Sequence, residues 1–164
     1  MGRTVINSIV LVIYLMMFIY TQQNYEWDIL RNLLKDANNF AVHDAAQEID
    51  DDEKSRGMIV FRKSEARSTY EDTLKLNLGL NHLFEPVPGS RLKDRVQILE
   101  FVLFDDSSHT FPFLYENDTY KITQLIERPA VLAVIQTDHP RFLGNFIQDP
   151  IMVTSVYQIK ENRR

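Results

Sequence analysis

An uncharged apolar segment that runs without a helix-breaking residue into an amphipathic pattern constrains this chain most. From Val5 to Tyr20 it reads V-I-N-S-I-V-L-V-I-Y-L-M-M-F-I-Y. As a helix these residues span about 24 Å, slightly less than a hydrocarbon core of about 30 Å, and Thr4 and Thr21 can extend the helix at both ends. We therefore predict a single-pass transmembrane anchor over residues 1–22.

Two other structures fit a segment of this kind. A cleaved signal peptide has an apolar region of similar length near the N-terminus, but this segment ends in Y-T-Q-Q-N, without a small-x-small cleavage site. A buried core helix fits poorly, because a helix that is apolar on all sides would then lie at the extreme N-terminus. Tyr20, Tyr25 and Trp27 gather where the segment ends, as aromatic residues do at a membrane surface. We predict these three as interface anchors, in contact with membrane lipid.

Charge predicts the orientation of the anchor and excludes one class of partner. Arg3 precedes the apolar segment, and the remainder of the chain is acidic, with a formal net charge of -5 overall. The positive-inside tendency places the N-terminus in the cytoplasm and the head outside it, at the cell membrane. An acidic chain lacks the basic face that binding to phosphates requires, so we expect no nucleic acid partner.

The helical pattern continues beyond the anchor. No Pro or Gly occurs between Arg3 and Arg56, and apolar residues recur every three or four positions. They are Trp27, Leu30, Leu33, Leu34, Ala37, Phe40, Ala41, Ala45 and Ile49. We predict one long helix, extended over residues 23–56; a break near Gln22–Asn24 into two helices is the alternative. Small side chains at Ala37, Ala41 and Ala45 allow another element to pack closely.

Residues 57–164 have the pattern of a small α+β head. A helix is predicted from an N-cap at Ser64 to Gly79, and strands over 58–61, 96–104, 111–115, 129–136 and 151–159. Residues 120–126 fit either a strand or a short helix. The run 129–136 is apolar throughout, which is typical of a strand buried on both faces. In 96–104, simple alternation puts Val96, Ile98, Val102 and Phe104 on one face.

These elements predict the fold class: α+β, with a long transmembrane-to-amphipathic helix packed on a mainly antiparallel sheet and one further helix. Such a sheet must cover its apolar face. The stripe from Leu30 to Ile49 is the nearest supply of apolar surface, so we expect this half of the long helix to lie across the sheet.

Residue patterns that carry chemistry are missing from the sequence. There is no cysteine, and the histidines at 43, 82, 109 and 139 have no metal-ligand spacing, which favours surface or loop positions for them. No serine lies in a nucleophile motif, and the glycines are too sparse to cradle phosphate. We expect a protein that is not an enzyme, with no catalytic residue, metal or cofactor.

Two polar residues interrupt the apolar segment. Asn7 and Ser8 lie where an amide without a partner is costly, and such groups usually hydrogen-bond to another helix. A position near the cytoplasmic interface, where Asn7 stays hydrated, is the alternative. The first reading makes Asn7 and Ser8 candidate residues for helix packing during assembly, together with Ala37, Ala41 and Ala45.

An apolar segment that runs into an Ala-rich amphipathic helix capped by a small α+β head resembles a pilin-class subunit. Within that class the chain is most similar to the TadE-like minor pilins, or pseudopilins, of tight-adherence (Tad) type IV pili. The resemblance is carried by the helix 5–49 and by the closing strands 130–136 and 151–159, and it is one of architecture.

The resemblance implies a subunit held in the bilayer by its apolar helix until that helix packs with equivalent helices in a filament. Partners would be other pilin-like subunits or proteins of a bacterial secretion or envelope machine. Prepilins are processed after a glycine and carry glutamate at the fifth mature position; here Gly2 precedes the segment, and Asn7 occupies that position. The alternative is a membrane-anchored accessory module that binds a partner through its head and never polymerises.

Overall fold

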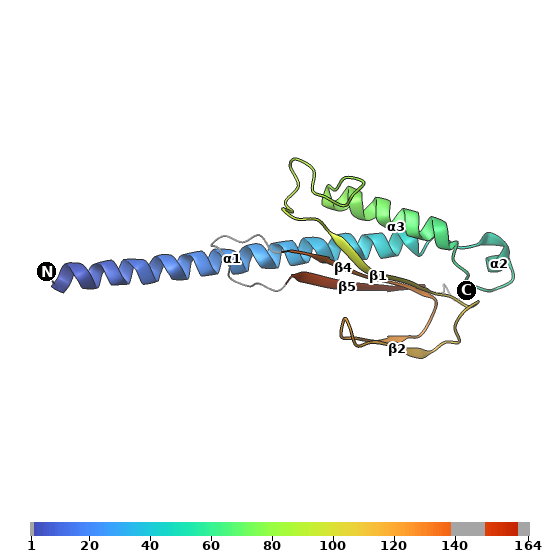
Figure 1. Ribbon diagram of the computed structural model, residues 1–164. Helices are drawn as coiled ribbons and strands as arrows, with labels where there is room; N and C mark the ends of the chain where they lie inside the picture. Colours follow the sequence, from blue (N-terminus) through green and yellow to red (C-terminus); the bar gives the residue numbers. More distant parts are fainter. Residues whose placement is uncertain (1, 139–149, 161–164) are drawn as a thin grey trace.

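The chain folds into a long helix that carries a three-layered head (Figure 1). The computed structural model describes residues 2–138 and 150–160. Its helices are α1 (Gly2–Ala45), α2 (Asp51–Ser55) and α3 (Lys63–Leu78); its strands are β1 (Gln97–Phe104), β2 (Phe113–Asn117), β3 (Ile122–Ile126), β4 (Ala130–Thr137) and β5 (Ile151–Gln158). The predicted α+β class, with a long N-terminal helix on a mainly antiparallel sheet, is confirmed.

Helix α1 has two halves with different surroundings. The N-terminal half projects away from the head, whereas the C-terminal half packs against α3, β4 and β5 (Figure 1). The helix is continuous through Gln22–Asn24, so the alternative of two separate helices is wrong. The expected docking of the Leu30–Ile49 stripe is confirmed for the helical part of that stripe apart from Phe40, which is exposed.

The helix ends earlier than the pattern predicts. Residues 23–56 were expected to extend it, but α1 stops at Ala45 and α2 is a separate helix. Asp50 caps α2 with its side chain, which accepts hydrogen bonds from the backbone N–H groups of Asp52 and Glu53. Residues 48–50 pair instead with 60–62 through backbone hydrogen bonds and an isolated bridge between Ile49 and Phe61. A long-range pairing therefore ends the helix where no Pro or Gly does.

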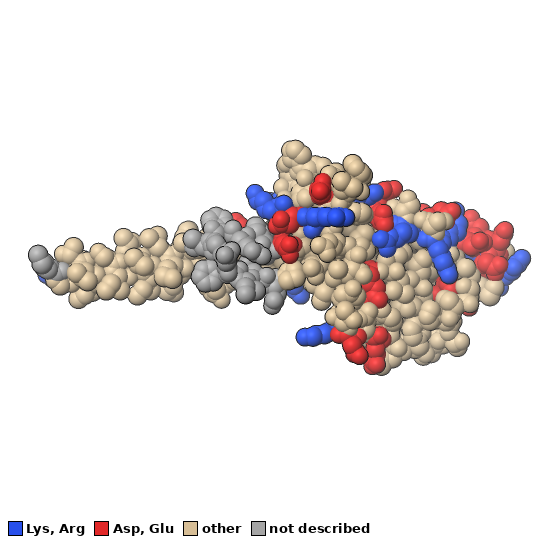
Figure 2. Space-filling model, viewed as in Figure 1, with Lys and Arg blue, Asp and Glu red and all other residues tan. Residues whose placement is uncertain are grey.

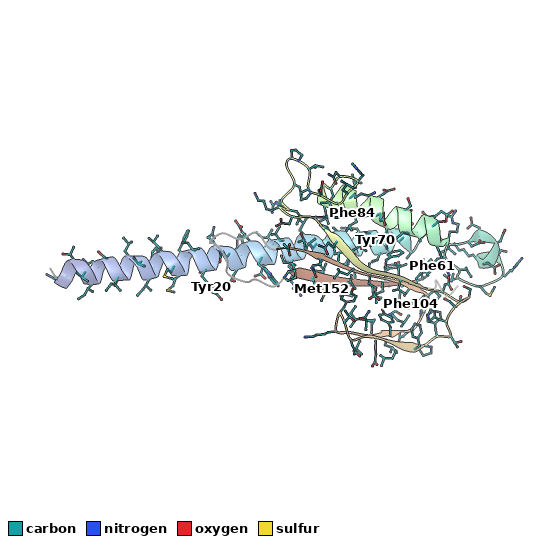
Figure 3. The ribbon with its side chains drawn as sticks, in the orientation of Figure 1. Tyr20, Phe61, Tyr70, Phe84, Phe104 and Met152 are labelled. Carbon is teal, nitrogen blue, oxygen red and sulfur yellow. The ribbon has the colours of Figure 1, made fainter. Side chains whose placement is uncertain are left out.

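The head has two apolar cores, one on each face of the three-stranded sheet, which has the order β1-β4-β5. Val131, Ala133 and Ile135 of β4 face α1 and α3, whereas Ala130, Leu132 and Val134 face the β2–β3 hairpin. Figure 3 shows one residue from each side: Tyr70 beneath α3 and Phe104 toward the hairpin. The prediction of a strand buried on both faces is confirmed, because β4 is central in the sheet and covered by two layers.

A β-bulge changes which side chains of β1 share a face. The register with β4 shifts between Ile98 and Glu100, and one extra residue reverses the alternation. Ile98 therefore packs in the helix-side core, apart from Val102 and Phe104 in the hairpin-side core. The predicted common face was wrong, since simple alternation assumes a strand without bulges.

Three local predictions have different outcomes. Residues 122–126 form a strand, paired with β2, rather than a short helix. Residues 58–61 form one isolated bridge instead of a strand. Arg62, and not Ser64, is the N-cap of α3, while Gly79 ends that helix with φ 61°, in the left-handed region that glycine tolerates.

A buried carboxylate fastens the turn after β1 to the segment before α3. Asp105 is fully buried; its side chain accepts hydrogen bonds from the hydroxyls of Ser107 and Ser108, both at 2.7 Å, and from the backbone N–H of Phe61 at 3.4 Å. Burial raises the pKa of Asp105, but these hydrogen bonds and the positive charge of Lys63 together outweigh burial, and its pKa lies below the usual value. The charged form therefore stabilises the fold.

Acid is expected to weaken this link. A lowered pKa in the folded state gives stability that is complete above the usual aspartate pKa, about 4, and is lost as the pH falls toward the folded value. Asp105→Asn should lower the free energy of unfolding by about 1–3 kcal/mol at pH 7 and by less at pH 3. Denaturant unfolding at both pH values measures this, with Asp118→Asn in an exposed turn as the control. A loss of equal size at both pH values would contradict a charge-dependent link.

Candidate functional site

The exposed N-terminal half of α1 is the most distinctive surface of the molecule. An 18-residue window of this helix has a mean hydropathy of 2.0, and none of that window is buried. The helix is long and apolar enough to cross a membrane near the N-terminus. In Figure 2 the visible part of the projecting stretch is almost entirely tan, whereas groups of red and blue side chains are distributed over the head. This half of the helix is compatible with a single-pass membrane anchor.

The polar side chains within this apolar surface differ in how they are satisfied. The Ser8 hydroxyl donates to the Thr4 carbonyl at 3.0 Å, and the Thr21 hydroxyl donates to the Met17 carbonyl at 2.9 Å, so both bond within the helix. Asn7 is exposed, and its amide has no hydrogen bond to the rest of the described chain. Asn7 can therefore bond outside its own helix, and assembly roles for Asn7 and Ser8 stay predictions.

The three aromatic residues predicted as interface anchors lie between the projecting helix and the head. Tyr20 and Tyr25 are 67% and 62% exposed, whereas Trp27 is half-buried and packs at the edge of the helix-side core. The guanidinium of Arg31 lies 5.7 Å from the centre of the Trp27 ring. This position suits residues at a membrane surface, and contact with lipid stays a prediction.

The alanines predicted for helix packing lie inside the head. Ala37, Ala41 and Ala45 are at most 3% exposed and belong to the core between α1, α3 and the sheet. Their small side chains bring elements of the same chain together, so none of the three is on an exposed face of α1. Phe40, which the pattern placed on the same stripe, is 59% exposed, because it lies well off the buried arc of the helix.

The position that sequence reasoning missed is Asn38, a fully buried amide at the centre of the head. Its side-chain N–H donates to the Ala133 carbonyl of β4 at 3.1 Å, and its side-chain oxygen accepts a hydrogen bond from the Tyr70 hydroxyl of α3 at 2.7 Å. Burial raises the pKa of Tyr70 well above its usual value, which keeps that hydroxyl protonated as a donor. The amide therefore joins α1, α3 and the sheet. Asn38 is four residues after Leu34 and three before Ala41, which puts it on the buried face of the helix; this spacing was the sequence signal that could have identified it.

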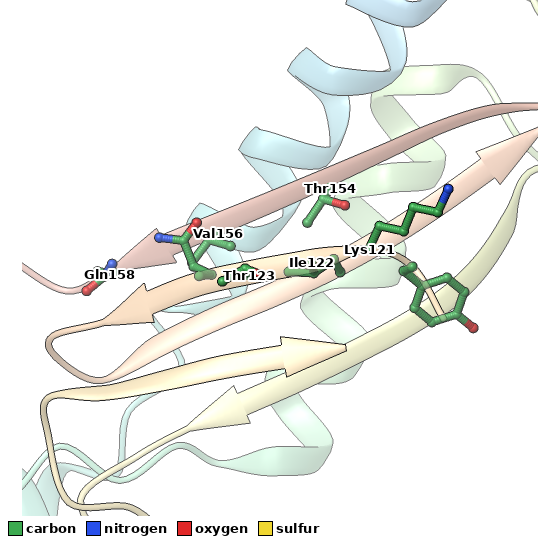
Figure 4. A pocket seen from close by; sticks show the side chains of 8 residues that line it. Lys121, Ile122, Thr123, Thr154, Val156 and Gln158 are labelled. Carbon is green, nitrogen blue, oxygen red and sulfur yellow. The ribbon is translucent and has the colours of Figure 1, made fainter. Parts of the chain in front are cut away.

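A shallow polar groove of about 420 Å³ lies between β3 and β5 (Figure 4). Both are edge strands of their sheets. The Gln158 side chain closes one end of the groove, since it accepts from the backbone N–H of Glu127 at 2.9 Å and donates to the Leu125 carbonyl at 3.1 Å. Thr123 and Thr154 supply hydroxyls, and Lys121 is the cation that lines it. Nothing in this set matches a nucleophile, a metal site or an acid–base pair.

The described histidines lie apart from one another. His43 in α1 packs edge-on against Tyr157, His82 is in an exposed loop, and His109 stacks on Phe113 with ring centres 4.9 Å apart. His139 lies outside the described residues. Within residues 2–138 and 150–160, no group of three or more acidic or histidine side chains is placed to hold a metal ion.

Comparison with known proteins identifies no relative: no family model, curated protein or solved structure matches this chain.

Proposed function

We propose that this chain is a non-enzymatic, membrane-anchored, pilin-like subunit that assembles through its apolar N-terminal helix into a pilus or a pilus-like secretion or envelope machine. The observation that carries the proposal is the division of α1. One uninterrupted helix has an exposed apolar half, while its other half forms part of the core of the head. Because the helix is continuous, a contact that positions the apolar half also positions the head.

Further observations support this assignment. The apolar half is uncharged from Thr4 to Gln23, and within the apolar run itself it offers a neighbouring helix the amide of Asn7, which makes no hydrogen bond to the described residues. In lipid, apolar side chains give no net drive for association, so a polar group of this kind can select the contact. The resemblance to TadE-like minor pilins of Tad pili belongs to this proposal, as do a cytoplasmic N-terminus and an extracytoplasmic head. Surface exposure of the head would follow assembly.

The second candidate is a membrane-anchored accessory module that binds a partner protein through its head without polymerising. The polar groove between β3 and β5 favours it, since a surface of this size on the head can contact a partner. In the filament subunit, anchor helices of many copies contact one another in series, whereas in the accessory module at most two anchor helices are in contact.

Disulfide cross-linking distinguishes the two candidates. The chain has no cysteine, so Asn7→Cys with Ile13→Cys introduces the only two thiols. A filament subunit contacts one neighbour on each side, and oxidation in the membrane should give a ladder of high-order species on a non-reducing gel. Each single-cysteine variant is the matched control, because one thiol per chain cannot extend a product beyond a dimer. A single dimer band from the double variant, or no band, would favour the accessory module.

A further inference from the structure

The base of the head carries a cleft that faces the membrane-proximal part of α1. It has a volume of about 340 Å³ and lies between one turn-rich loop and the helix. The helix contributes Gln22, Tyr25, Glu26, Ile29 and Leu30, and the loop contributes Ser90, Arg91 and Lys93. In Figure 1 this loop follows α3, whose C-terminal end points toward the projecting half of α1.

The cleft begins at the level of the lipid headgroups when α1 spans a bilayer. The apolar run ends at Tyr20, and a rise of about 1.5 Å per residue puts Gln22 about 3 Å and Ile29 about 14 Å beyond it. The polar zone of a bilayer extends about 5–8 Å past the hydrocarbon on each side. The membrane-proximal part of the cleft therefore lies among the phosphates when α1 spans the membrane.

The chemistry of the cleft suits an anionic amphiphile. Arg91 and Lys93 are exposed, and among the described residues neither is in an ion pair. One carboxylate, Glu26, lines the cleft with them, so cationic groups are in excess although the chain as a whole is acidic. Tyr25, Ile29 and Leu30 add an apolar wall on the side of the helix. Cationic groups beside an apolar wall match a headgroup phosphate and its glycerol and upper acyl carbons.

We infer that this cleft binds the headgroup of an anionic phospholipid of the membrane that holds α1, with Arg91 and Lys93 on the phosphate. The inference depends on the membrane anchoring in the proposed function but not on assembly. Bound lipid would fix the angle between the bilayer and the head, because α1 and the loop both contact the headgroup.

The test uses the full chain in a neutral detergent, titrated with dioctanoyl phosphatidylglycerol or dioctanoyl phosphatidylcholine. Trp27, the sole tryptophan, reports binding by fluorescence, and native mass spectrometry counts retained lipid. We expect one phosphatidylglycerol bound, with at least about fivefold higher affinity than phosphatidylcholine. Sodium chloride at about 0.5 M should reduce the preference, since it screens exposed charges.

The variant Arg91→Gln with Lys93→Gln should abolish the preference. The matched control, Lys54→Gln with Arg56→Gln, removes two charges at α2, at the other end of the head, and should retain it (Figure 1). Equal affinities in the wild type, or equal losses in both variants, would overturn the inference. Competition by soluble glycerol 3-phosphate at the same concentration would overturn the assignment to lipid.

Flotation with phosphatidylcholine vesicles separates this inference from the proposal on which it depends. A chain that fails to float is not anchored, which refutes the proposed function. A chain that floats but shows no preference for phosphatidylglycerol refutes the lipid site alone.

Discussion

Removal of residues 1–22 is expected to abolish membrane association and to leave a water-soluble monomer with an intact head. Among the described residues, Trp27 is the first along α1 that belongs to an apolar core, so residues 2–22 lie outside both cores. The full chain should require detergent for extraction, whereas the fragment 23–164 should remain in solution without it. Size-exclusion chromatography and circular dichroism measure the two effects, and unfolding of the fragment should be cooperative.

A longer deletion is the matched control. Removal of residues 1–37 also deletes Leu30, Leu34 and Ala37, which are buried. Truncation of one buried leucine to alanine alone costs about 2–5 kcal/mol, against a total stability of about 5–15 kcal/mol. This fragment should be unfolded or aggregated. A fragment 23–164 that is equally unfolded would show that the head needs the apolar half, and a full chain that is soluble without detergent would refute the anchor.

Substitution of Asn38 by alanine is expected to give the largest loss of stability from a single polar side chain. It leaves the Tyr70 hydroxyl and the Ala133 carbonyl without their partner in the core between α1, α3 and β4. Each buried polar group left unpaired costs about 1–3 kcal/mol, so the loss of two such partners should lower the free energy of unfolding by about 2–6 kcal/mol. Denaturant unfolding of the fragment 23–164 measures it.

The neighbouring residue supplies the control. Asn39 is exposed on the outer face of the same helix, and Asn39→Ala should change the free energy of unfolding by less than about 0.5 kcal/mol. Tyr70→Phe combined with Asn38→Ala should cost less than the sum of the two single changes, because the phenyl ring needs no acceptor. Additive losses would show that the two side chains do not act together.

Other elements of the fold follow from short-range patterns. The continuity of α1 through Gln22–Asn24 and the left-handed end of α3 at Gly79 depend on residues within one or two helical turns. The burial of β4 on both faces is encoded in its unbroken apolar run. An unbroken apolar run likewise predicts the exposed apolar half of α1.

The sequence alone determined the long helix, its apolar first half and the α+β order of the head, because periodicity and turn chemistry are local properties. Only the tertiary structure decided where α1 ends, which side chains of β1 share a face, and that Asn38 is an internal link. Each of these depends on a partner far along the chain: residues 60–62 for the helix end, β4 for the bulge, and Tyr70 with Ala133 for the amide. It also decided that Ala37, Ala41 and Ala45 pack within their own chain, since helical spacing defines a face but not what covers it.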